Sequence, residues 1–135
     1  MFKVHRMNAY FMAAAALAFV VGLVHSVLGE RLIFLRLRQG RLQPSRGGQL
    51  LGAGHVGILW ASWHGLTILG WGFAAVLLWM GLHPAGADVA GFVVHAVVVS
   101  MLLTSALVLV GTRAKHPGWA ALLCAAVLVW LGRTA

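Results

Sequence analysis

The sequence predicts an all-α integral membrane protein, a bundle of four transmembrane helices with a basic, partly amphipathic loop between the first and second helices. Two observations support this fold class. Of the 135 residues, 61% are hydrophobic and only 9% are charged, whereas a soluble domain carries about 25% charged residues. The charged residues also cluster between long apolar runs. Lipid must therefore solvate most of the surface, and a chain of this length is expected to form one domain, 1–135.

The four expected spans are apolar segments that carry almost no charge. They cover residues 8–29, 52–81, 88–111 and 117–132. A helix needs about 20 apolar residues to cross the hydrocarbon core, so the second span is long enough to tilt or to extend beyond the bilayer, and the fourth is short. Pro117 stands where a proline favours the start of a helix. The poor cleavage signal after Val24 indicates that the first span is retained as a helix.

The connection between the first two spans is rich in arginine. Its arginines are Arg31, Arg36, Arg38, Arg41 and Arg46. Over residues 31–38 they mix with bulky apolar residues, which is typical of a helical extension or of an amphipathic segment at the headgroups. We expect the first four arginines to contact lipid headgroups, and Pro44 and the following glycine pair to end the helix.

Charge predicts the orientation of the chain. With four spans, the loops after spans one and three share a side, and they hold seven of the ten Lys and Arg residues. The positive-inside rule then puts these loops in the cytoplasm and both termini outside, in a membrane such as the bacterial inner membrane. Lys3 and Arg6 oppose this orientation, because a basic N-terminus tends to stay inside. Topology and anionic lipid explain the net charge of +8, so no nucleic-acid partner is expected.

Small residues predict the faces on which the helices pack. In lipid, helices approach each other closely where side chains are small. The expected packing positions recur at steps of three and four residues, and they are Gly22 and Ser26 in the first span and Gly57, Ala61 and Gly65 in the second. The same faces would turn His25 and His64 toward the interior of the bundle.

Four histidines within the apolar segments are the candidate ligands of a haem b or a metal ion, since neutral imidazole commonly fills that role. They are His25, His55, His64 and His95. Their depths favour two pairs, His64 with His95 and His25 with His55, and a bis-histidine haem b needs such a pair on facing helices. His55 lies about half a turn away from the face of His64. The competing expectation is that each histidine makes one hydrogen bond between helices.

A transition-metal site would need three or four converging ligands, and His25, Glu30 and His64 are the candidates. Glu30 is the one acid on the basic side. We expect it to form a salt bridge with a basic residue, Arg31, Arg113 or Lys115, or to orient His25. A Ser/His/acid hydrolase is excluded, because His25 and its neighbour Ser26 point about 100° apart on a helix. Cys124, the single cysteine, is expected to be a buried packing residue.

The sequence contains no complete catalytic constellation and favours a non-enzymatic role. The leading hypothesis is an accessory or scaffolding subunit of a membrane complex, which packs against other subunits or against itself. The alternative is a redox protein that binds haem b or a metal ion through its intramembrane histidines. A further alternative is a small dimeric transporter. No Asp or Glu lies in the middle of a span, which argues against a proton-coupled cation exporter.

Overall fold

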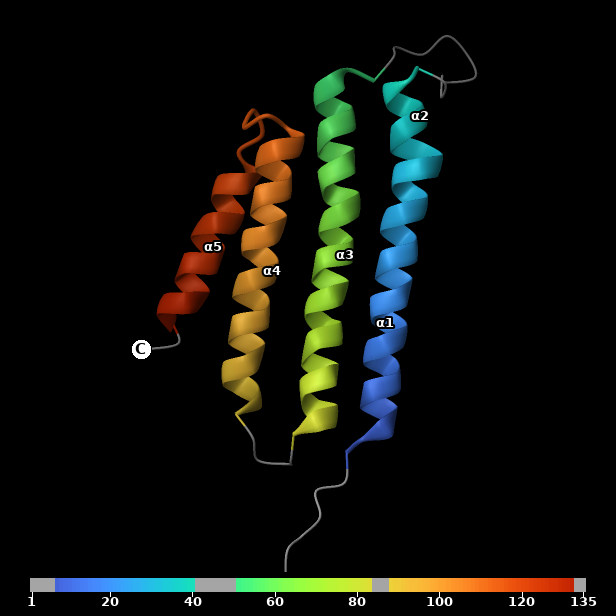
Figure 1. Ribbon diagram of the computed structural model, residues 1–135. Helices are drawn as coiled ribbons and strands as arrows, with labels where there is room; N and C mark the ends of the chain where they lie inside the picture. The colour runs from blue at the N-terminus through green and yellow to red at the C-terminus, as the bar shows by residue number, and fades with distance from the viewer. Residues whose placement is uncertain (1–6, 41–50, 84–87, 133–135) are drawn as a thin grey trace, which may run out of the picture.

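The computed structural model describes residues 7–40, 51–83 and 88–132, and nearly all of them are helical (Figure 1). The elements are α1 (Ala9–Leu28), the π-helix η1 (Gly29–Phe34), α2 (Leu35–Arg38), α3 (Ala53–Leu82), α4 (Val89–Gly111) and α5 (Gly118–Gly132). Among the described residues, three continuous helices are long and apolar enough to cross a membrane: Ala9–Arg38, Ala53–Leu82 and Val89–Gly111. The fourth, α5, has 15 residues. The predicted all-helical fold is confirmed, with three of the four predicted spans long enough to cross a membrane and the fourth shorter.

Local sequence signals set the ends of these helices. The side chain of Asn8 accepts hydrogen bonds from the backbone N–H groups of the first turn of α1, and Asp88 accepts one from Gly91 at the start of α4. Both are residue types that satisfy the free donors of a first turn. Helix α4 ends in an unusual turn, because Arg113 and Ala114 both have positive φ, 52° and 62°.

The first helix continues beyond its predicted end. It passes through the π-helix η1 and ends at Arg38, so the mixed apolar and basic segment is a helical extension rather than a separate loop. A π-helical turn has one residue more than an α-helical turn, and such turns occur at functional sites. Residues 41–50, which include Arg41, Arg46 and the predicted helix breakers, lie outside the described residues.

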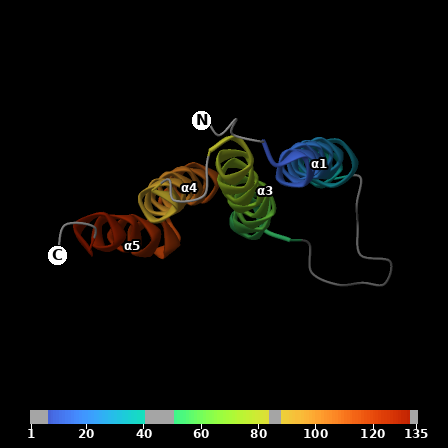
Figure 2. The same cartoon turned by 90° about the horizontal axis from the view of Figure 1, so that it is seen from below.

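The helices stand side by side in one row in the order α1, α3, α4, α5 (Figure 2). Contacts concentrate between neighbours in this row, namely α1 and η1 with α3, α3 with α4, and α4 with α5. The predicted bundle therefore lacks a closed interior in this chain. The reason lies in α3, which has two faces of small or polar residues and packs with a different neighbour on each.

Burial is correspondingly low. Large apolar side chains such as Leu17, Phe73 and Leu128 are about 66%, 72% and 68% exposed, which suits surfaces that face lipid or another membrane protein. Cys124 is exposed as well, so its prediction as a buried packing residue is wrong. It lies on a helix at the end of the row, where only one neighbouring helix covers it.

Candidate functional site

Polar side chains gather where the C-terminal part of α1 and η1 meet α3. The hydroxyl of Ser26 lies 2.7 Å from Nδ1 of His64. It donates to the hydroxyl of Thr67 over 3.1 Å, and Thr67 donates to the carbonyl of Gly22 over 3.5 Å. These bonds link the two helices through side chains that would otherwise be unpaired in an apolar environment.

The tautomer of His64 depends on the direction of these hydrogen bonds. Where the Ser26 hydroxyl donates to Thr67, it accepts from Nδ1–H of His64. The other ring nitrogen, Nε2, then carries a lone pair. It is buried without a hydrogen-bond partner among the described residues, and its nearest charged neighbour is a carboxylate oxygen of Glu30 at 3.7 Å. Two acceptors thus face each other, and a proton, a donor or a cation between them would remove the repulsion.

Glu30 is held from two sides. The indole N–H of Trp60 donates to one carboxylate oxygen over 3.0 Å, and Arg38 forms an ion pair with the other. The predicted salt bridge exists, but its partner is Arg38 rather than Arg31, Arg113 or Lys115. The cause is the helical extension, which carries Arg38 two turns beyond Glu30 along the same helix.

Two tryptophans of α3 bind main-chain carbonyls of α1. Trp63 donates to the carbonyl of His25 and Trp71 to that of Phe19, each over 3.1 Å. Gly29 of η1 and Gly22 of α1 make room for the indole rings, because a Cβ at Gly29 would collide with Trp63 and a Cβ at Gly22 would collide with Trp71. Each tryptophan therefore requires the glycine opposite to it.

His25 belongs to the same cluster through its ring. It stacks on Trp63 with centroids 4.2 Å apart and planes 5° apart. Its Nε2 is buried and, like that of His64, has no hydrogen-bond partner within the described part of the chain. Phe34 is buried next to this stack, and its ring centroid lies 6.0 Å from that of Trp63 and 6.0 Å from that of His64. The Nε2 atoms of His25 and His64 are therefore both buried among aromatic rings without a hydrogen-bond partner in the described residues.

The other two histidines lie elsewhere. His55 is exposed near the start of α3, one or two turns closer to the helix end than the cluster. His95 is exposed on α4, where its Nδ1 lies 2.6 Å from the carbonyl of Gly91 and its ring meets the edge of Trp130. The structure therefore brings together neither the pair His25 and His55 nor the pair His64 and His95.

The distance between His64 and His95 follows from the helix register. Gly72 of α3 lies against Ser100 near the middle of α4, and the two histidines stand on opposite sides of this level. At 1.5 Å per residue, they are about 20 Å apart along the helix axes. His64 thus lies on the basic side of this level and His95 on the other side, and one haem iron cannot bind both.

The predicted metal ligands are assembled in part. Among the described residues, no group of three or more His, Cys, Asp and Glu side chains is arranged to hold a metal ion. His64 and Glu30 are adjacent, while the ring of His25 lies against Trp63. A metal ion at this position would need further ligands besides His64 and Glu30.

The predicted packing residues all lie at helix contacts. Gly22 and Ser26 meet α3, as described above. A Cβ at Gly57 would collide with the carbonyl oxygen of Gly111 on α4, and one at Gly65 would lie 3.0 Å from Thr104. Ala61, between them, is fully buried. Of the arginines predicted to meet headgroups, Arg31, Arg36 and Arg38 are exposed.

Sequence reasoning missed the roles of Trp60, Thr67 and Trp71, although a signal was present. Together with His64 they recur at steps of four, three and four residues, which places them on one face of α3. Hydrogen-bonding residues in such a seam indicate a polar contact between helices.

No protein-family model, curated protein or solved structure matches this chain.

Proposed function

We propose that this protein is a non-enzymatic subunit of a membrane complex, with its basic end in the cytoplasm. The observation that carries the proposal is the open row of helices. Within the described residues, α1 and α5 stand at its two ends, and each contacts a neighbouring helix on one side. Broad surfaces of the molecule are left for lipid or for other membrane helices.

The free side of α1 suits close helix packing. Ala13, Ala14 and Ala16 are exposed there, and small side chains let a second helix approach closely in lipid. On α3, Gly70 has open space around its Cα, with nothing within 4 Å of a Cβ built on it. These positions support association with another subunit or with a second copy of the chain.

Site-specific photo-cross-linking in native membranes tests the proposal. A photoreactive phenylalanine analogue is introduced at Leu17 on α1 or at Leu128 on α5, which are both exposed. The control position is Ala74, which is buried within the row. We expect a discrete protein adduct from at least one exposed position and none from the control. Adducts with lipid alone at every exposed position would refute the proposal.

A second candidate function is cofactor or metal binding by His25 and His64. The observation that favours it is the pair of buried Nε2 atoms without hydrogen-bond partners in the described residues. An unpaired buried nitrogen costs about 1–3 kcal/mol, and such an atom in a native structure points to a missing ligand, water or ion. The carboxylate of Glu30, 3.7 Å from one of these nitrogens, supplies the negative charge that a cation would need.

An absorption spectrum and elemental analysis of the purified protein test this candidate. Haem b would give a Soret band, and a metal ion would appear in stoichiometric amount. We expect His64→Ala to abolish either signal and His55→Ala, a change of an exposed histidine outside the cluster, to leave it intact. A colourless, metal-free protein after expression with iron and haem precursors would eliminate the candidate.

A further inference from the structure

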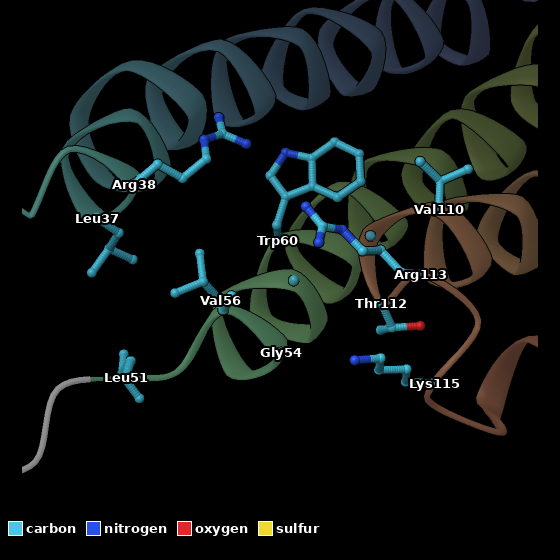
Figure 3. A pocket seen from close by; sticks show the side chains of 13 residues that line it. Leu37, Arg38, Leu51, Gly54, Val56, Trp60, Val110, Thr112, Arg113 and Lys115 are labelled. Atoms are coloured by element: carbon cyan, nitrogen blue, oxygen red, sulfur yellow. The ribbon is translucent and has the colours of Figure 1, made fainter.

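A pocket opens at the basic end of the molecule, next to the histidine cluster, with which it shares Arg38 and Trp60. It has a volume of about 690 Å³ and lies between α2, the first turns of α3 and the turn that follows α4 (Figure 3). Three cationic side chains line it. Arg38 enters from one side and Arg113 and Lys115 from the other, with the indole of Trp60 between them (Figure 3). The volume falls within the range of about 300–1,000 Å³ that is usual for ligand sites.

The chain cannot neutralise these charges from within. It has only two acidic residues, Glu30 and Asp88. Glu30 is already engaged by Arg38 and Trp60. Asp88 caps the far end of α4, about 35 Å away along a helix of 23 residues. Among the described residues neither Arg113 nor Lys115 has a carboxylate partner. An anionic ligand would therefore complement the charges of Arg113 and Lys115.

The backbone adds to the positive character of the pocket. Helix α3 begins at its wall, and its N-cap, Gly52, offers no side chain to the free N–H groups of the first turn. These groups and the helix dipole favour an anion. The left-handed turn at Arg113 and Ala114, with φ of 52° and 62°, is a conformation that side chains disfavour. This turn reverses the direction of the chain between α4 and α5, and Arg113 within it lines the pocket.

The length of α4 indicates how deep the pocket would lie in a membrane. Its wall includes the contact between Gly57 of α3 and Gly111, the last residue of α4. Helix α4 is about 35 Å long at 1.5 Å per residue, close to the thickness of the hydrocarbon core of about 30 Å. The end of α4 therefore marks the edge of the hydrocarbon. Leu37 and Val56 also line the pocket and offer apolar contacts.

We propose that this pocket binds the phosphate-bearing headgroup of an anionic phospholipid. Arg113 and Lys115 contact the phosphate, and Arg38 contributes charge while it holds Glu30. Trp60, with the apolar wall, packs on the glycerol and the first methylenes of the acyl chains. Basic pockets between transmembrane helices recognise anionic headgroups in this way. The proposal assigns a particular pocket and does not depend on the subunit role proposed above.

Native mass spectrometry of the full chain, released from nanodiscs of phosphatidylglycerol and phosphatidylcholine, tests the proposal. We expect retained phosphatidylglycerol on the native chain, and about tenfold less on the double variant Arg113→Gln/Lys115→Gln. The matched control is Arg31→Gln/Arg36→Gln, which removes the same charge from exposed arginines outside the pocket. The control should lose clearly less lipid than the pocket variant, because Arg31 and Arg36 attract headgroups without lining the pocket. Circular dichroism confirms that both variants keep their helices.

Three outcomes would overturn the proposal. Equal loss of lipid in both double variants would mean diffuse attraction rather than a pocket. Equal retention of the two lipids by the native chain would mean that the pocket does not select negative charge. A third arm adds inorganic phosphate to the protein in neutral detergent. Binding of phosphate together with no retention of phosphatidylglycerol would identify the pocket as a site for free phosphate.

Discussion

Helix α3 attaches to its two neighbours in two different ways. Toward α1 it presents hydroxyl, imidazole and indole groups, and these make at least four side-chain hydrogen bonds to that helix. Toward α4 it presents Gly57, Gly65 and Gly72, and the contact is one of backbones and small side chains. In lipid, hydrogen bonds and close packing of this kind hold helices together, because the hydrophobic effect that packs helices in water is absent there. We call the hydrogen-bonded contact with α1 the polar seam and the contact through Gly57, Gly65 and Gly72 the glycine seam. The directions of the hydrogen bonds fix the helix register in the polar seam, whereas the fit of the surfaces fixes it in the glycine seam.

Their sensitivity to substitution should differ accordingly. The contact between α3 and α4 leaves no room for a Cβ at Gly57, because the opposing atoms there belong to the backbone of Gly111. The polar seam consists of several modest bonds, so one loss leaves the others in place. Four substitutions test this difference, and for each the free energy of unfolding is measured by titration with dodecyl sulfate and circular dichroism.

The largest effect is expected for Gly57→Ala. The new Cβ would collide with the carbonyl oxygen of Gly111, and such overpacking costs about 1–3 kcal/mol or more. The matched control is Gly70→Ala on the same helix, where nothing lies within 4 Å. It should be neutral or slightly stabilising, since alanine favours helix more than glycine. Equal stability of the two variants would show that α3 and α4 do not meet at this point.

Ser26→Ala is expected to come next. It removes the acceptor of His64 Nδ1–H and the donor to Thr67. Hydrogen bonds between membrane helices contribute about 0.6 kcal/mol each and at most about 1.7 kcal/mol, so we expect a loss of about 1 kcal/mol. Ser62→Ala, at an exposed position of α3, serves as the control. A neutral Ser26 variant would argue against the polar seam.

A smaller effect is expected for Trp63→Phe. Phenylalanine keeps an aromatic ring against His25 and Phe34 but loses the N–H that binds the carbonyl of His25. The expected loss is about 0.6 kcal/mol or somewhat more. For comparison, Trp119→Phe removes an indole for which no hydrogen bond is seen among the described residues. If both cost the same, ring volume rather than the hydrogen bond explains the effect.

The smallest effect is expected at the outer contact of the row. Ser105 of α4 donates to the carbonyl of Trp119 at the start of α5 over 2.7 Å. Ser105→Ala should cost about 0.5 kcal/mol, because a carbonyl in the first turn of a helix keeps its intrahelical bond. A loss larger than that of Ser26→Ala would reverse the ranking of the two ends of the row.

Much of the polar seam could be read from the sequence. Ser26 and Gly22 on one helix, and His64 on the other, have the correct periodicity, and the structure does bring them together. The partner of Glu30 could not be read in this way, because it depends on how far the first helix continues. The pairing of His64 with His95 failed for a related reason. Periodicity gives the direction of a side chain on its own helix, but the register between helices decides which residues stand at the same depth.

The sequence by itself determined that this chain forms helices apolar enough to span a membrane, since 61% of its residues are hydrophobic and only 9% are charged, far from the composition of a soluble domain. It also determined which face of α1 and of α3 is small or polar. Only the tertiary structure decided that α3 is flanked by α1 on one face and α4 on another, so that four helices form a row instead of a closed bundle. The physical reason is that lipid makes apolar faces nearly equivalent as partners. The choice between them rests on local fits, such as the indole of Trp63 over Gly29 or the backbone of Gly57 against Gly111, which exist only once the helices have met.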